Sequence, residues 1–130
     1  MENADITFVN LETPLSDTAK RKGAFLAPTA FASGLKWAGI DVVSTANNHA
    51  LDAGVAGLKD TLTSLSQVSL TAVGSGKDFA SARLPFITEK YGIRLGFLAY
   101  TMSENSGDSS YAKPNRAGVM PTDLSLIQED

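Results

Sequence analysis

Two short stretches of this sequence hold polar side chains that could do chemistry. The first is Asn10-Leu11-Glu12, and the second is Asn47-Asn48-His49-Ala50-Leu51-Asp52. His49 is the only histidine among the 130 residues. Carboxylate and amide oxygens are ligands for hard divalent cations, and imidazole adds affinity for transition metals. The two stretches therefore indicate a candidate metal or acid–base site.

The same residue types are also common in turns that follow strands. Asn and Asp side chains bond nearby backbone groups, and this role needs no ligand. Residue chemistry alone does not decide between a functional site and a structural turn. The single histidine is the feature that favours function.

Each polar stretch follows a segment that is typical of a β-strand. Residues 4–9 are rich in β-forming residues, and residues 40–44 form a β-branched apolar run. In an open α/β sheet, ligands bind beyond the carboxyl ends of such strands. If these two strands are neighbours, Glu12 and His49 face one cleft.

The rest of the chain alternates helix and strand signals. Apolar spacing predicts helices at 29–38 and 54–66, and strands are expected at 70–73, 86–89 and 93–100. The last two strands flank a Lys-Tyr-Gly turn and predict a hairpin. The order β-α-β-α-β followed by a hairpin predicts an α/β fold with a mixed sheet, parallel in its first half.

Four other segments carry smaller predictions. Residues 15–27 include Lys20-Arg21-Lys22 and are expected to form a surface loop, with contact to an anionic polymer left open. Gly74-Ser75-Gly76 is expected to be a plain turn, and Trp37 is expected to pack in the core. Residues 103–116 are expected to form a polar loop.

Composition excludes several classes of function. The net charge of −3 argues against a basic surface of the kind that binds nucleic acid. Cysteine is absent, which excludes disulfides, thiolate chemistry and cysteine-type zinc sites. No apolar run is long enough to span a bilayer, and the N-terminus lacks a signal-peptide pattern. The chain starts just before a strand and stops within a starting helix, so we expect a fragment that is truncated at both ends.

The residues around both polar stretches resemble the CapA family of capsule and poly-γ-glutamate biosynthesis proteins, which are similar to calcineurin-like metallophosphatases. The matching segments are 9–15, 38–44, 46–54, Gly57-Leu58 and 93–101. The block Asn-Asn-His-x-x-Asp-x-Gly is fairly specific, and the resemblance covers most of the chain. It implies that residues 1–130 are a single partial domain, part of a metallophosphatase-like α/β sandwich.

The resemblance also implies roles for single residues. It makes His49 catalytic, as the group that steadies phosphoryl oxygens or protonates a leaving group. The implied metal ligands are Glu12, Asn48 and Asn10, and the implied supporting residues, which orient His49 or fix the turn, are Asp52 and Asn47. Two divalent ions (Mn, Zn or Fe) would activate a water. The family's first aspartate motif and later histidine motifs are missing, so we expect weak metal binding or none, and no activity, in this chain alone.

The function implied by the resemblance is the synthesis, release or anchoring of an anionic exopolymer. The parent protein would act outside the cytoplasm, at the cell surface or with membrane-bound biosynthesis subunits, on the polymer or on a phosphorylated substrate. The implied activity is a metal-dependent phosphoesterase-type hydrolysis. Two alternatives stay open, a non-catalytic scaffold or polymer-binding subunit with the same fold, and a phosphoesterase for an unrelated small substrate.

Overall fold

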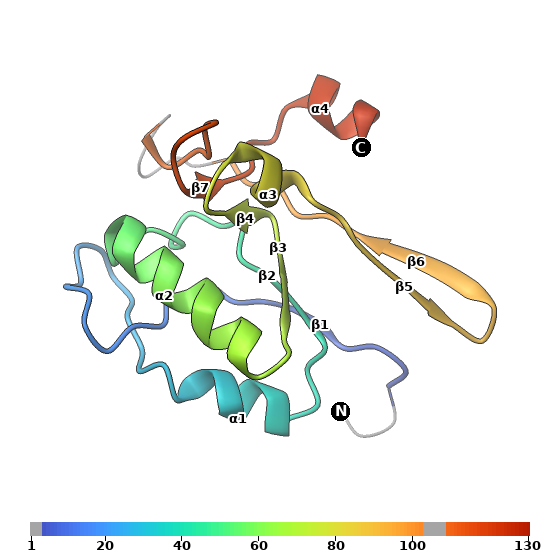
Figure 1. Ribbon diagram of the computed structural model, residues 1–130, viewed down its shortest axis with the longest axis horizontal. Coiled ribbons are helices and arrows are strands. Elements are labelled where there is room, and N and C mark those ends of the chain that lie inside the picture. Colours follow the sequence, from blue (N-terminus) through green and yellow to red (C-terminus); the bar gives the residue numbers. More distant parts are fainter. Residues whose placement is uncertain (1–3, 103–108) are drawn as a thin grey trace.

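A computed structural model describes residues 4–102 and 109–130 of the chain (Figure 1). The elements in chain order are β1 (Phe8–Asn10), α1 (Phe31–Trp37), β2 (Val42–Ser44), α2 (Gly54–Gln67), β3 (Thr71–Val73), β4 (Ser75–Gly76), α3 (Phe79–Arg83), β5 (Phe86–Lys90), β6 (Ile93–Phe97), β7 (Gly118–Val119) and α4 (Leu124–Glu129). None of the helices in these residues has the length and apolar character needed to cross a bilayer. The predicted α/β class, with parallel strands before an antiparallel hairpin, is confirmed.

The parallel strands form a sheet with the order β1-β2-β3. Val43 in β2 stands opposite Val9 in β1 and Ala72 in β3. All three residues of β2 are buried, which explains the two adjacent valines in this strand. Because β1 and β2 are parallel neighbours, as predicted, their carboxyl ends lie at the same edge of the sheet.

The main core lies between this sheet and the helices α1 and α2, which lie side by side (Figure 1). Its buried residues are Leu15, Ala32, Ile40, Val43, Leu65 and Leu70. Leu15 is fully buried and forms a β-bridge with Ala27. The segment 15–27 is therefore more than the predicted surface loop, because both of its ends are tied into the structure. Burying one leucine side chain contributes about 1.5–3 kcal/mol.

The prediction that Trp37 packs in the core is wrong, because its side chain is 91% exposed. Helix α1 buries Ala32, and Leu35 packs at the edge of the core. Trp37 follows Leu35 by two positions and so lies on the opposite side of the helix. The helix ends before Gly39, whose φ of +81° is the left-handed conformation expected at that position.

The segment Gly74-Ser75-Gly76 is only partly the predicted turn. Gly74 has a φ of +84°, and a Cβ atom there would lie 2.5 Å from the carbonyl oxygen of Ala99. Ser75 and Gly76 then form β4, which pairs antiparallel with β7. Their partner strand lies far along the chain, so local sequence alone did not indicate the pairing.

The predicted loop at 103–116 falls partly outside the described residues, since the structure describes nothing between 103 and 108. The part that is described is tied down by β-bridges. Tyr111 pairs with Val119, and Lys113 pairs with Arg116. This end of the chain is therefore more regular than its polar composition indicates.

Strands β5 and β6 form the predicted hairpin, which extends away from the parallel sheet (Figure 1). Tyr91 and Gly92 have φ values of 53° and 77°, as in a two-residue type I′ turn. Strand β6 ends at Phe97, earlier than predicted. The ring of Phe97 stacks on that of Phe8 in β1 with centroids 5.4 Å apart, which joins the base of the hairpin to the sheet.

Candidate functional site

The second polar stretch forms a tight loop between β2 and α2. The N–H of Asp52 donates to the carbonyl of His49 at 2.9 Å, and the N–H of Gly54 donates to that of Leu51 at 2.7 Å. Gly54 has a φ of +67° and begins helix α2. The polar side chains therefore lie on consecutive turns at the carboxyl end of β2, where α/β proteins bind ligands.

Asn47 fixes this loop to the end of β1. Its side-chain Nδ2 donates to Oδ1 of Asn10 at 3.1 Å and to the carbonyl of Leu11 at 2.9 Å. Its Oδ1 accepts from the backbone N–H of His49 at 3.1 Å. The residue is only 7% exposed, and a buried amide that loses such partners is costly. Asn47 therefore joins the two polar stretches that the sequence singled out.

The ring of His49 is paired with a carboxylate. Its Nδ1 lies 3.1 Å from Oδ2 of Asp52, and the two side chains are 21% and 12% exposed. The ring of Phe25 meets the imidazole edge-on, with centroids 4.5 Å apart. A carboxylate that accepts from Nδ1–H fixes the ring and leaves Nε2 to act on a ligand.

Asp52 also holds the segment that precedes α1. Its Oδ2 accepts from the N–H of Phe25 at 2.8 Å. Its backbone carbonyl accepts from the N–H groups of Lys22 and Gly23 at 2.5 Å and 2.8 Å. A Cβ atom on Gly23 would lie 2.1 Å from Oδ1 of Asp52, so this close approach requires glycine. No local signal in the sequence indicates that residues 22–25 contact the His49 loop.

Within the described residues, the side chains of Glu12 and Asn48 make no hydrogen bond. Glu12 is exposed beyond the end of β1, and Asn48 is half-buried beside His49. Within the described part of the chain, no hydrogen bond or ion pair joins Glu12 to His49, although their strands are neighbours. The oxygens of Glu12 and Asn48 are therefore available to a ligand.

The ligands that the resemblance implies are chemically suitable for Mn, Zn or Fe. They are the carboxylate of Glu12 and the amide oxygens of Asn48 and Asn10, and Oδ1 of Asn10 already accepts from Asn47. Within residues 4–102 and 109–130, no three His, Cys, Asp or Glu side chains lie close enough together to hold a metal ion. Further ligands would have to come from outside this set.

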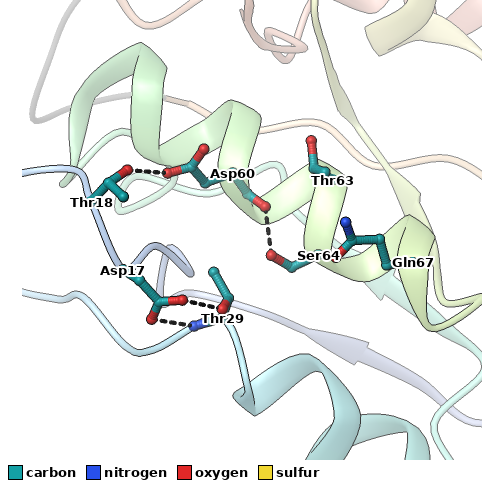
Figure 2. A pocket seen from close by; sticks show the side chains of 7 residues that line it. All are labelled: Asp17, Thr18, Thr29, Asp60, Thr63, Ser64 and Gln67. Carbon is teal, nitrogen blue, oxygen red and sulfur yellow. Dashed lines mark hydrogen bonds between the residues drawn. The ribbon is translucent and has the colours of Figure 1, made fainter.

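A separate pocket of about 230 Å³ lies between the segment 17–29 and helix α2 (Figure 2). Its lining residues are Asp17, Thr18, Thr29, Asp60, Thr63, Ser64 and Gln67. This pocket was not predicted from the sequence, although four of its residues have the spacing of one helix face, namely Asp60, Thr63, Ser64 and Gln67. None of the predicted site residues lines this pocket.

Polar groups in this pocket bond to one another (Figure 2). The hydroxyl of Thr29 donates to Asp17, as does its backbone N–H at 3.1 Å, and these bonds lower the pKa of Asp17 below its usual value. The hydroxyl of Thr18 donates to Asp60 at 3.2 Å. The Thr18–Asp60 bond holds the segment 17–29 against α2, and the Asp17–Thr29 bonds join the two ends of that segment, so both have a structural role.

The fold is that of an α/β protein, and polar side chains at the carboxyl ends of the adjacent parallel strands β1 and β2 form its candidate ligand site. The sequence profile described as bacterial capsule synthesis protein PGA_cap matches residues 1–130. The chain belongs to this family, which confirms the resemblance that its residues indicate.

Three curated relatives are similar to this chain. It is 38% identical over 94 residues to the PGA biosynthesis protein CapA of Bacillus subtilis, covering 72% of this chain and 24% of that protein. It is 34% identical over 67 residues to the capsule biosynthesis protein CapA of Bacillus anthracis, covering 52% and 16%. It is 31% identical over 123 residues to a "probable polyglutamine synthesis accessory protein" of Mycobacterium tuberculosis, covering 88% and 32%. The chain thus spans a third or less of the length of these relatives.

Proposed function

We propose that this chain carries the His49 part of a metal-dependent phosphoesterase-type site. The protein containing it would act in making, releasing or anchoring an anionic capsule polymer of the polyglutamate class. The observation that carries the proposal is the pairing of His49 Nδ1 with Asp52 at 3.1 Å, at the carboxyl end of β2 and beside β1. The name of the Bacillus subtilis relative, a PGA biosynthesis protein, supports the polymer.

The chemistry follows from the fixed orientation of the imidazole. Asp52 holds Nδ1, so Nε2–H of a protonated ring would donate to a leaving-group or phosphoryl oxygen. Such an acid contributes about 10²–10⁴-fold to a rate. Glu12, Asn48 and Asn10 would hold a divalent ion, which supplies Lewis-acid activation of water or of the phosphoryl group when it is bound.

The proposed setting rests on the relatives. The 130 residues would form one partial domain of a longer protein, because the chain spans only 24% of the first relative. That protein would act outside the cytoplasm, at the cell surface or with membrane-bound biosynthesis subunits. Its substrate would be the polymer itself or a phosphorylated precursor.

A second candidate is a non-catalytic scaffold or polymer-binding subunit. It is favoured by the structural use of Asn47 and Asp52, which both bond backbone groups. It is also favoured because the described residues contain no group of three His, Cys, Asp or Glu side chains that could hold a metal ion. A scaffold would keep these contacts without any turnover.

Substitutions in the longer protein that contains this chain separate the two candidates. His49→Ala should lower hydrolysis of p-nitrophenyl phosphate or its diester about 10²–10⁴-fold while leaving metal content near that of the wild type. Asn48→Ala should lower metal content and hydrolysis together. Turnover is measured by absorbance and metal content by elemental analysis. The control matched to Asn48→Ala is Asn115→Ala, which removes an exposed amide outside the site.

Two results would reject catalysis by His49. One is unchanged turnover in the His49→Ala protein, and the other is a wild-type protein with no metal-stimulated hydrolysis. Either result would favour the scaffold.

A further inference from the structure

The segment Lys20-Arg21-Lys22 places three consecutive cations on a chain whose net charge is −3. All three side chains are exposed. The ion pairs that the described residues form are His49 with Asp52, and Arg83 with Glu129 and with Asp130. Within that part of the chain, the three cations therefore have no carboxylate partner. Such a local positive patch attracts anions although the whole chain is acidic.

Backbone hydrogen bonds fix this segment to the loop that carries His49. The N–H groups of Lys22 and Gly23 donate to the carbonyl of Asp52 at 2.5 Å and 2.8 Å. Phe25 donates its N–H to Asp52 Oδ2 at 2.8 Å and packs its ring on His49. The cations therefore lie beside the candidate site.

Among the three cations, Lys22 is the one whose charged group is placed next to the loop that carries His49. A Cβ atom built on Gly54 would lie 3.3 Å from Lys22 Nζ, so this group lies over the start of α2, just after Asp52. Among the described residues, no carboxylate lies within ion-pair distance of this ammonium group, so it stays open to an anion from solution.

We propose that Lys20, Arg21 and Lys22 bind successive carboxylates of an anionic polymer and hold the polymer strand beside His49. This inference rests on the proposed function and names the residues that would select a polymer over a small substrate. One polymer strand can meet several cations at once, and each further contact is intramolecular. A monomer meets one cation and gains nothing from the others.

A binding experiment with the full chain tests the role of the segment. The probe is fluorescently labelled poly-γ-glutamate at low salt, and the readout is fluorescence anisotropy. The triple variant Lys20→Gln, Arg21→Gln, Lys22→Gln should weaken binding about 10- to 100-fold. The control is Lys77→Gln, Lys90→Gln, Arg94→Gln, which removes the same formal charge from exposed positions on other elements and should change affinity less than about threefold. Thermal melts check that both variants fold.

Equal weakening by both triple variants would overturn the proposal, because binding would then follow net charge alone. Unchanged affinity in the first variant would overturn it as well. Monomeric glutamate at the same carboxylate concentration should fail to compete, and effective competition would show a single-carboxylate site. Single-stranded DNA that binds as tightly as poly-γ-glutamate would contradict a carboxylate polymer as the ligand.

Further measurements separate this inference from the proposed catalysis. His49→Gln should keep poly-γ-glutamate affinity within about threefold, because the cations and their backbone bonds remain. In the longer protein, the first triple variant should keep hydrolysis of p-nitrophenyl phosphate. Loss of polymer binding in His49→Gln equal to that in the triple variant would overturn the role of the cations. Loss of phosphoester hydrolysis only in the His49 variant would leave the role of the cations intact.

Discussion

Asp52 connects three parts of the chain through one side chain and one carbonyl group. Its carboxylate bonds the imidazole of His49 and the N–H of Phe25, and its carbonyl bonds the N–H groups of Lys22 and Gly23. The functional group and the basic segment are thus held by the same residue. A substitution at Asp52 should affect both stability and the position of His49.

We predict that Asp52→Ala lowers the free energy of unfolding by about 1–3 kcal/mol, because Phe25 N–H and His49 Nδ1 lose their partly buried acceptor. Asp52→Asn should cost less, since both bonds are made to Oδ2 and an amide oxygen in its place can still accept them. Urea denaturation of the full chain measures both values. The control is Asp5→Ala, which removes an exposed carboxylate near the N-terminus. A change below about 0.5 kcal/mol in Asp52→Ala would show that these bonds do not stabilise the fold.

Among the elements, the β5–β6 hairpin shows a conflict between turn geometry and residue type. Its type I′ turn needs positive φ at both central residues, and Tyr91 adopts 53° although it is not glycine. A left-handed conformation costs such a residue about 1–2 kcal/mol. Tyr91 is 86% exposed, so its ring contributes little burial in return.

We therefore predict that Tyr91→Asn stabilises the hairpin by about 0.5–1 kcal/mol, because Asn-Gly is the preferred type I′ pair. Gly92→Ala should destabilise it by about 1 kcal/mol, since alanine is strained at a φ of +77°. Amide hydrogen exchange of β5 and β6 measures how often the hairpin opens locally, and so reports its stability directly. Slower exchange is expected in the first variant and faster exchange in the second. Exchange rates that do not differ between the two variants would contradict the assigned turn.

The sequence predicted those elements whose signal is local. The apolar spacing of α2, the β-branched run of β2 and the turn of the hairpin all lie within short windows. It missed the burial of Leu15 and the β4–β7 pairing, which depend on partners far along the chain. The predicted parallel pairing of β1 and β2 brings Asn47 to Asn10, although this contact itself was not predicted, whereas the contact of Phe25 with His49 depends on a loop that has no periodic signal.

At the scale of the whole molecule, two apolar clusters stabilise the part of the chain that the structure describes. One lies under the parallel sheet and includes Leu15, Val43 and Leu65. The other joins α3 to the end of the chain and includes Ala82 and Met120. Neither cluster contains a predicted metal ligand. Folding of these residues should therefore depend on apolar burial and not on a bound ion.

We accordingly predict that the 130-residue chain folds without metal and binds Mn²⁺ or Zn²⁺ weakly at best. Its predicted ligands are one carboxylate, that of Glu12, and the amides of Asn10 and Asn48, which are weak compensation for lost hydration. Calorimetric titration should give small heats, and added metal should raise Tm by no more than about 2 °C. Asn48→Ala is the matched control and should melt at the same temperature with and without metal. Tight stoichiometric binding with a large rise in Tm, lost in that control, would show that the ligand set is complete within these residues.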